Sequence, residues 1–411
     1  MTVTLEKVRG VWGSAPSKNY EQLASRFRGV FQQIREGAVQ RENERKLPFE
    51  EIQLLKEAGF GAIRIPREEG GLGATLPELF TLLIELGEAD SNIPQALRAH
   101  FSFVEMVLNS PKGEQRSKWI KRILDGDLVG NAWSEVAGAK AGSFLTNVTR
   151  GEGDQLFLNG TKYYSTGTIY ADWILVLATR DDNHIFAVIS RYAKGVDVID
   201  DWNGFGQKLT ASGTTRFTDV SIKEEEILTE EFNAQYLAGF FQMMHLATLA
   251  GIARAAATDV SKAVAERQRT YTHAAGARPS EDPQVLQVVG KIHSLAYAAG
   301  AIVVKTAESL QQAYEVRLSG DVENEEVLND EVEIEVSQAQ TVVSSLTLEA
   351  SELLFDALGA SATLQTKSFD RYWRNARTLA SHNPLIYKER VVGDYAVNQT
   401  RPPYVWHVGR S

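Results

Sequence analysis

The sequence predicts a multidomain α+β protein, in which an N-terminal helical domain, a central β domain and a C-terminal helix bundle follow one another. Apolar residues recur at three- and four-residue spacing before about residue 126 and after about residue 233. The stretch between them consists of short runs rich in Val, Ile, Thr and aromatic residues. Because 411 residues are too many for one comfortable core, we expect three domains, at residues 1–126, 127–232 and 233–411.

Three helices are expected in the N-terminal domain. Apolar residues from Leu23 to Ile34 form one helical face, and Pro48 marks the start of a second helix that forms a hairpin with the first. Gly59 should end the second helix, and residues 62–66 should then form a short extended piece. A third helix is expected from about Pro77 through Leu86, because its leucines share one apolar face.

The central domain should contain six or more strands, which favours a compact barrel or sandwich. Asn159-Gly160 is typical of a tight turn, so residues 155–158 and 161–164 are predicted to form a hairpin around it. Residues 173–178 and 185–189 have the composition of central strands, and residues 217–222 that of a further strand.

The C-terminal domain is predicted to be a four-helix bundle. Small residues from Ala247 to Ala257 permit close helix packing, and long helices are expected over residues 285–314 and 333–358. The strongly acidic stretch at residues 320–335 is predicted to be a solvated face without a functional site.

Composition excludes several classes of function. The net charge of −10 argues against nucleic-acid binding, and the absence of cysteine excludes disulfides, thiolate metal sites and cysteine nucleophiles. The seven histidines lack the spacing of a metal-ligand pair, so no metal site is expected. No signal peptide and no run of eighteen apolar residues is found, so we expect a cytoplasmic protein that does not span a membrane. Redox chemistry would depend on a bound cofactor.

Four segments, in order along the chain, carry a resemblance to a known family. They are residues 59–73, with Pro66 and Gly70-Gly71-Leu72-Gly73; residues 130–135 (Gly-Asn-Ala-Trp-Ser-Glu); residues 162–173, with Lys162 to Gly167 and Ala171-Asp172-Trp173; and residues 217–220 (Phe-Thr-Asp-Val). Together with the order of helical, β and helical domains, they resemble the acyl-CoA dehydrogenases over nearly the whole chain.

Two departures from that family bear on the chemistry. The family's carboxylate base commonly follows the segment that matches residues 370–377, but residues 381–388 contain no acid and the next one is Glu389. The glycine pair that approaches the adenine half of FAD is missing from residues 357–362 (Ala-Leu-Gly-Ala-Ser-Ala). The first departure lowers the expectation of dehydrogenation, and the second favours FMN over FAD.

Other residues are similar to a flavin-dependent monooxygenase branch of the family, which includes dibenzothiophene monooxygenases and sulfur-acquisition oxidoreductases. They are Trp202, Arg269, residues 369–375 and His382-Asn383-Pro384. This resemblance implies a two-component FMNH2-dependent monooxygenase that takes reduced FMN from a separate reductase and reacts with molecular oxygen. Such an enzyme forms a flavin C4a-hydroperoxide and oxygenates a small apolar substrate at sulfur or nitrogen. The resemblance also implies a homotetramer.

The candidate catalytic residues are His382, His100, Thr166 and Asn131. An imidazole titrates near neutrality, so that His382 can donate to the peroxide or carry its proton. The resemblance places His100 on the helix that approaches the substrate. Thr166 and Asn131 supply neutral donors and acceptors where charge develops on the flavin ring.

The candidate flavin-binding residues follow from the same resemblance. They are Asn131, Ser134, Ser165 and Thr166 at the ring edge, Trp202 and His382 beside the ring, and Arg269 and Arg371 at the phosphate. A guanidinium suits a phosphate because it binds bidentately and stays charged. We expect Arg269 and Arg371 to serve one site from different subunits.

Two alternatives remain open from the sequence. The first is an FAD-dependent acyl-CoA dehydrogenase or nitroalkane-type oxidase with an unrecognised base, which would be purified with FAD bound. The second is a non-catalytic helical scaffold of the same fold, which would fail to bind FMN in either redox state.

Overall fold

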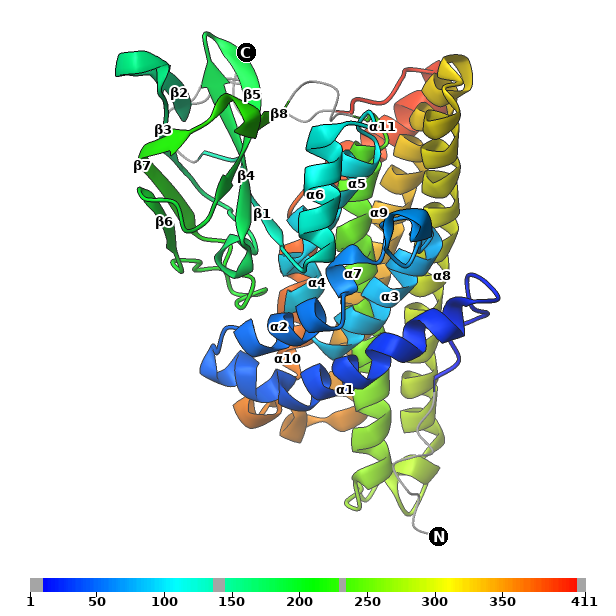
Figure 1. Ribbon diagram of the computed structural model, residues 1–411. Coiled ribbons are helices and arrows are strands. Elements are labelled where there is room, and N and C mark those ends of the chain that lie inside the picture. The colour runs from blue at the N-terminus through cyan, green and yellow to red at the C-terminus, as the bar shows by residue number, and fades with distance from the viewer. Residues whose placement is uncertain (1–9, 136–144, 229–233, 405–411) are drawn as a thin grey trace.

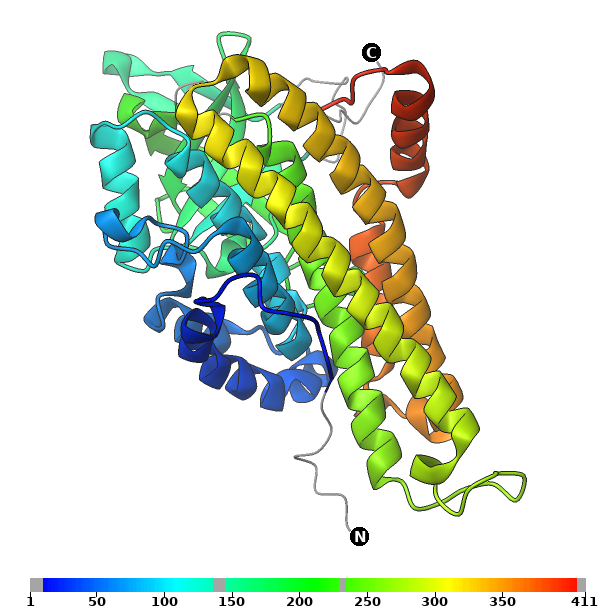
Figure 2. The same ribbon diagram turned by 90° about the vertical axis from the view of Figure 1, so that its right-hand side faces the viewer.

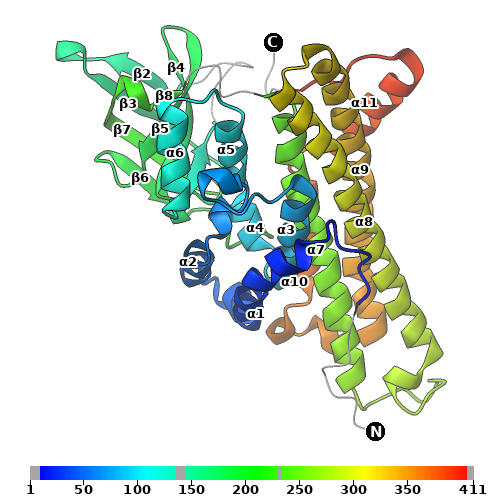
Figure 3. The ribbon, with the colours of Figure 1, turned by 45° about the vertical axis from the view of Figure 1, so that its right-hand side comes forward.

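The computed structural model describes residues 10–135, 145–228 and 234–404. Its strands form a β domain that stands beside a helical body, and long helices run the length of that body (Figure 1). Shorter helices from the first third of the chain lie between the β domain and the long helices (Figure 3). The α+β class and the order of the three parts are confirmed.

The N-terminal part is helical. Its helices are α1 (Tyr20–Glu44), α2 (Phe49–Glu57), α3 (Leu76–Ala89), α4 (Asn92–Ala96), α5 (Arg98–Leu108) and α6 (Glu114–Leu124). A capping box fixes the start of α3, because Thr75 Oγ1 accepts from the Glu78 amide and the Glu78 carboxylate accepts from the Thr75 amide. Most of α3 is buried, since it packs against α1 on one side and the long helices on the other.

The extended piece predicted at residues 62–66 is wrong. Gly59 adopts a left-handed conformation with φ 74°, and a short 3-10 helix, η2 (Phe60–Ala62), follows it. The Ile63 and Ile65 amides then donate to the carbonyls of Phe60 and Ala62, which continues the turn. Ile63 and Ile65 are both fully buried, so their alternation reflects a tight turn against the core rather than a strand.

The described residues of the β domain form one sheet of eight strands. They are β1 (Val129–Ala132), β2 (Asn147–Arg150), β3 (Leu156–Lys162), β4 (Trp173–Arg180), β5 (Asn183–Ser190), β6 (Val196–Ile199), β7 (Thr214–Ile222) and β8 (Ile227–Leu228). The order is β6-β7-β3-β2-β4-β5-β8, and β1 runs parallel to β4. One face of the sheet encloses a small apolar core of its own, and β1 also contacts α5.

The hairpin predicted at Asn159-Gly160 is wrong. β3 runs straight through both residues and pairs with β2 on one side and β7 on the other. The pairing with β7 shifts register between Leu158 and Gly160, which is the mark of a β-bulge. A Cβ at Gly160 would lie 2.4 Å from Thr146 Oγ1, so glycine serves here to let two strands approach closely.

The C-terminal part contains α7 (Leu237–Glu266), α8 (Pro283–Ser319), α9 (Val322–Leu358), α10 (Asp370–Ala380) and α11 (Leu385–Asn398). The helices α7, α8 and α9 lie side by side (Figure 2), and α10 packs against α7 and α9 to complete the predicted bundle. Asp282 and Asp321 cap the starts of α8 and α9, and Gly320 ends α8 with φ 75°.

The acidic stretch at residues 320–335 is only partly solvated. Its first residues are exposed, as predicted, but Glu325 and Glu333 are buried. Glu333 accepts a hydrogen bond from Lys388 Nζ at 2.8 Å, and Glu325 pairs with Arg317 at 3.0 Å. The prediction is wrong at these positions because α11 and the end of α8 bring cations against the inner face of α9.

Two glycines allow α3 and α7 to cross closely. A Cβ at Gly251 would lie 2.7 Å from the Gly87 Cα, and Gly87 in turn faces the backbone of Thr248. Both helices therefore approach to backbone contact, which fixes the first half of α7 against the N-terminal helices. That half of α7 carries residues of the site described below.

By length and composition, α8 is the helix of the described chain that is apolar enough to cross a membrane. Only 28% of its most apolar 18-residue window is buried within the chain.

Candidate functional site

Two histidines from different helices meet where the end of α10 reaches α7. His382 lies in the turn after α10 and His245 lies on α7, with ring centroids 4.4 Å apart and planes inclined by 42°. His382 is exposed, whereas His245 is fully buried and neither of its ring nitrogens has a hydrogen-bond partner in the described chain. The pair forms a polar patch with unused hydrogen-bonding capacity.

The turn that carries His382 is fixed from three sides. The His382 amide donates to the Leu379 carbonyl at 3.1 Å, which continues the end of α10. Asn383 Nδ2 donates to Gln242 Oε1 on α7 at 2.6 Å, and Gln340 Nε2 on α9 donates to the Asn383 carbonyl at 3.0 Å. These bonds hold the imidazole of His382 in place relative to the bundle.

The electrostatics around the two imidazoles favour their neutral forms. The protein packed around the exposed His382 ring, followed by the positive charge of Arg98, lowers the pKa of His382. Burial, His382 and Arg98 together hold the pKa of His245 well below its usual value. Both rings are therefore neutral at physiological pH and each offers one donor and one acceptor.

Arg98, at the start of α5, is the cation beside these rings. Its Nε donates to the Phe241 carbonyl at 3.1 Å, and its guanidinium lies 5.0 Å from the centre of the Phe241 ring. Trp133 packs edge-on against the same ring at 5.2 Å, and the buried Nε1 of Trp133 has no partner in the described chain. Arg98, Phe241 and Trp133 thus join the histidine pair to the end of β1.

Asn131 faces the same side as Trp133. Ala132 points into the core of the β domain, so that its neighbours in the alternating strand, Asn131 and Trp133, point away from that core. Thr168 Oγ1 accepts from the Asn131 amide at 3.0 Å and donates to its carbonyl at 2.8 Å. The backbone is therefore fixed, and the half-buried Asn131 side chain keeps its hydrogen-bonding capacity within the described chain.

Ser134 and Thr166 are the accessible hydroxyls among the predicted flavin contacts. Ser134 is exposed and pairs through its backbone with Tyr163. Thr166 is half-buried, and its Oγ1 lies 2.7 Å from Ser212 Oγ. The structure therefore keeps both available beside a ligand.

The side chains of Ser165 and Trp202 differ in what they contact. The Ser165 side chain is buried and has no hydrogen-bond partner in the described chain, so its hydroxyl faces the protein interior. Trp202 Nε1 donates to the Gln207 carbonyl at 3.1 Å, and its ring lies edge-on to Tyr164 at 6.0 Å. The Ser165 amide donates to the Gly213 carbonyl and its carbonyl accepts from the Thr168 amide, so that the buried hydroxyl is its unused group within the described chain. Its role as a flavin contact stays a prediction, as does that of Trp202, whose ring is half-buried.

His100 has the contacts of a structural residue. Its Nε2 donates to the Gly61 carbonyl at 2.9 Å and its Nδ1 accepts from the Val129 amide at 3.3 Å. Burial lowers the pKa of His100 to about 4. With both nitrogens bonded to main chain and the ring 1% exposed, His100 ties η2 to β1 and has no nitrogen left for catalysis.

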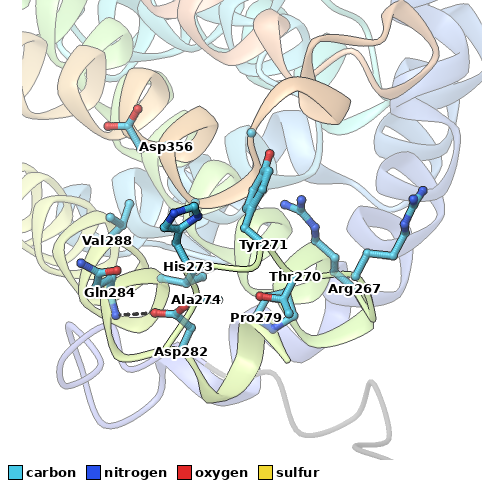
Figure 4. A pocket seen from close by; sticks show the side chains of 14 residues that line it. Arg267, Thr270, Tyr271, His273, Ala274, Pro279, Asp282, Gln284, Val288 and Asp356 are labelled. Atoms are coloured by element: carbon cyan, nitrogen blue, oxygen red, sulfur yellow. Dashed lines mark hydrogen bonds between the residues drawn. The ribbon is translucent and has the colours of Figure 1, made fainter. Parts of the chain in front are cut away.

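Arg269 lies at the opposite end of the bundle, in a cavity of about 500 Å³ between α7, α8 and the end of α9. Figure 4 shows Arg267, Tyr271 and His273 around this cavity, with Asp356 on its far side. Gly359, from the segment that lacks a glycine pair, lines the same cavity. The cavity thus brings a predicted phosphate ligand close to the segment expected to favour FMN.

The cavity and the histidine pair are far apart within one chain. From His245 to the end of α7 at Glu266 the helix rises about 32 Å, at 1.5 Å per residue. Arg269 follows that end. A flavin bound beside His382 therefore meets Arg269 only if the arginine comes from another copy of the chain.

Arg371 is engaged within its own chain. Its guanidinium pairs with Asp259 at 3.2 Å, donates to the Ser368 carbonyl at 2.9 Å and contacts the Tyr372 hydroxyl. Asp259 also pairs with Arg35 at 2.7 Å. A phosphate bound at this position would have to share Arg371 with Asp259. The sequence did not predict this ion pair.

Arg98 and His245 are site residues that sequence reasoning missed. Each is a polar residue in a mostly apolar helical stretch, Arg98 before residues 99–108 and His245 within residues 237–257. The contrast between these polar residues and their apolar neighbours is the sequence feature that could have identified them. Within the described residues, no cluster of three or more His, Asp or Glu side chains is arranged to hold a metal ion.

Family models match most of the chain. The acyl-CoA dehydrogenase N-terminal, middle and C-terminal domain models match residues 17–127, 132–220 and 243–385. The three matches follow the helical, β and helical parts of the structure in order.

Individual proteins are similar over nearly the whole length. A dibenzothiophene monooxygenase from Mycolicibacterium goodii is 26% identical over 86% of this chain and 88% of its own. The probable FMNH2-dependent monooxygenase SfnC from Pseudomonas putida is 25% identical over 95% and 97%.

Two solved structures have the same fold at 25% identity. FMN-bound TdsC from Paenibacillus sp. A11-2 superposes with a TM-score of 0.84 over 93% of this chain and 99% of its own. Methanesulfinate monooxygenase MsuC from Pseudomonas fluorescens superposes with a TM-score of 0.83 over 93% and 98%.

Proposed function

Because the chain belongs to the acyl-CoA dehydrogenase family, and within it to the flavin-dependent monooxygenases, we propose that it is the oxygenase component of a two-component system. It takes reduced FMN from a separate flavin reductase and transfers one oxygen atom of O2 to a small organic substrate at sulfur or nitrogen. The FMN bound to TdsC and the FMNH2 dependence in the name of SfnC support this cofactor.

The observation that carries the proposal is the neutral pair His245 and His382. A dehydrogenase needs a carboxylate to remove a proton from carbon, but the charge that acts on both of these rings is the cation Arg98. Within the described chain, no carboxylate hydrogen-bonds to either ring. The pair is suited to hydrogen-bond a bound oxygen species and unsuited to abstract a carbon-bound proton.

The residues present fit a flavin ring between β1 and α7. When bound, reduced FMN supplies the two electrons that activate O2. Asn131, Ser134 and Thr166 offer neutral donors and acceptors to the ring edge, while Trp133 and Phe241 provide an apolar wall that excludes water. The neutral imidazole of His382 offers a further hydrogen-bond donor.

We further propose that the chain forms a homotetramer in which Arg269 serves a neighbour's flavin phosphate. The length of α7 separates Arg269 from His382 of the same chain by about 32 Å or more. The apolar helix α8 is largely uncovered within one chain, with Leu286, Tyr297 and Leu318 exposed. A neighbouring copy that covers α8 would bury this surface.

Isotope incorporation tests the oxygenase function. FMN is photoreduced without a reductase and mixed with the protein under 18O2 and one of three probes, dibenzothiophene, indole or methanesulfinate. We expect 18O in the product of at least one probe, and only when reduced FMN is supplied. A protein that yields no labelled product, and whose tightly bound FAD is reduced anaerobically by an acyl-CoA thioester, would be a dehydrogenase instead.

A further inference from the structure

Among the residues that the structure describes, Arg98 is a cation without an anionic partner. Its Nε bonds to the Phe241 carbonyl, but its two terminal nitrogens have no hydrogen-bond partner within the described residues. No carboxylate within that part of the chain forms an ion pair with it. Desolvation lowers the pKa of Arg98 to about 10, and no nearby anion offsets the effect. Arg98 is therefore still charged at neutral pH.

A half-buried charge without a counterion is costly to a folded protein. Three of the four arginines that are buried elsewhere in the described chain pair with acids, Arg41 with Asp90, Arg64 with Glu105 and Arg116 with Glu69. The fourth, Arg254, forms no ion pair within the described residues, and its guanidinium lies over the Trp12 ring at 5.1 Å. Arg98 departs from that pattern at the one place where His245 and His382 also offer unused hydrogen-bonding groups. A ligand that carries a negative charge would supply the missing partner.

We propose that Arg98 binds an oxyanion group of the substrate, either a carboxylate or a sulfur oxyanion, and thereby selects anionic substrates. This inference rests on the proposed function, because it assigns the substrate class of the same site. The guanidinium offers its two terminal nitrogens as a fork that matches two oxygens of such a group. His245, beside it, has a donor for a third bond.

A substrate that binds Arg98 carries an anionic group, so it is not wholly apolar as the sequence analysis expected. The rings of Phe241 and Trp133 provide an apolar wall next to Arg98. A substrate with an anionic end and a small apolar or soft heteroatom end would satisfy both surfaces. The competing role for Arg98 is to bind the flavin itself, and the experiment separates the two roles.

The test compares matched anionic and neutral probes by calorimetry, on the protein loaded with FMN. The pairs are methanesulfinate with dimethyl sulfoxide, and (methylthio)acetate with its amide. We expect the wild type to bind the anion of each pair at least about 10-fold more tightly. Arg98→Gln should lower affinity for the anions by about 10- to 100-fold and leave affinity for the neutral probes unchanged. Arg98→Lys should retain part of the preference.

Arg122→Gln is the matched control, because Arg122 also stacks on aromatic rings, those of Trp119 and Trp173, but lies on α6. It should keep the full preference for anions. The inference is overturned if the wild type shows no such preference, or if Arg98→Gln keeps it. It is also overturned if Arg98→Gln lowers the affinity for reduced FMN and for both members of each probe pair by the same factor. That result would show that Arg98 binds the flavin. An anion preference in a protein that fails to bind reduced FMN would sustain this inference and refute the proposed function.

Discussion

Single residues at the site differ mainly in how much of their hydrogen-bonding capacity the fold uses. Both ring nitrogens of His100 are hydrogen-bonded to main-chain atoms. Within the described residues, the ring nitrogens of His245 have no hydrogen-bond partner, and those of His382 have one, Asn383 Oδ1 at 3.3 Å. An imidazole that is fully bonded positions the backbone around it. An imidazole with free nitrogens can act on a ligand.

Removal of the His382 imidazole should uncouple the reaction. In His382→Ala we expect the fold and most of the reduced-FMN affinity to remain, because the ring makes few structural bonds. The fraction of O2 recovered as product should fall by about 100-fold or more, with hydrogen peroxide rising instead, since a positioned donor or acid commonly contributes that much. The exposed residue His184 on β5 provides the control variant, His184→Ala. Unchanged coupling in His382→Ala would remove His382 from the mechanism.

His100 should contribute a pH dependence to stability. Its pKa is about 4 in the folded chain and 6.5 when unfolded, so the unfolded state takes up a proton first as the pH falls. Stability from this group is fully present above pH 6.5 and is lost as the pH falls towards 4, by about 3 kcal/mol in total. Urea unfolding between pH 7.5 and 4.5 should show a shallower decline for His100→Gln than for the wild type. Parallel profiles would contradict the structural role.

The sequence predicted site residues where a motif carried them and missed those that depend on packing. His382 and Asn131 lie in short patterns that resemble a family, and their roles at a flavin stay predictions. Arg98 and His245 were missed because their significance lies in what the tertiary structure leaves unpaired. The single-chain ion pair of Arg371 with Asp259 spans 112 positions and has no local signature.

Secondary structure was predictable for long helices and less so for short segments. The helices α3, α8 and α9 follow apolar periodicity and capping residues that can be read in the sequence. Asn159-Gly160 was misjudged, because a bulge and a tight turn both use glycine's conformational freedom and only the neighbouring strand β2 decides between them. Residues 62–66 were misjudged for a similar reason. They form a turn whose apolar residues are buried, and these apolar residues alternate in the sequence as they would in a strand.

The crossing of α3 and α7 should tolerate no added side chain. In Gly251→Val the new atoms would meet Gly87 Cα at 2.7 Å and the Ile84 carbonyl at 2.8 Å. We expect a loss of about 1–3 kcal/mol or more in the free energy of unfolding, as in overpacked cores. Gly29→Ala on α1 is the control, because no atom lies within 4 Å of its Cβ; it should be neutral or slightly stabilising. Equal stabilities of the two variants in denaturant unfolding would refute the close crossing.

The whole molecule places its candidate flavin contacts at two distant positions. The histidine pair lies at the first half of α7, and the cavity with Arg269 lies beyond the end of that helix. This separation is what leads us to propose a site shared between subunits. Sequence reasoning proposed the same arrangement from family resemblance, but it had no measure of the separation along α7.

Mixed oligomers test the shared site. Arg269→Ala and Arg371→Ala chains should each bind reduced FMN weakly, and mixing them should restore part of the binding. Rescue is expected because some mixed sites then contain both wild-type arginines from different chains. Mass spectrometry should first confirm that hybrids form, and unfolding should confirm that Arg371→Ala tolerates the loss of its pair with Asp259. Hybrids that form without any recovery of binding would show that both arginines serve the flavin from one chain.

The most direct test of the central claim is the affinity for the two redox states of FMN, measured by anaerobic calorimetry on one preparation. An oxygenase that captures flavin released by a reductase must bind the reduced form appreciably more tightly than the oxidised form. We predict that preference, together with a protein that is purified without bound FAD. Equal affinities for FMNH2 and FMN, or a tightly held FAD, would contradict the two-component monooxygenase.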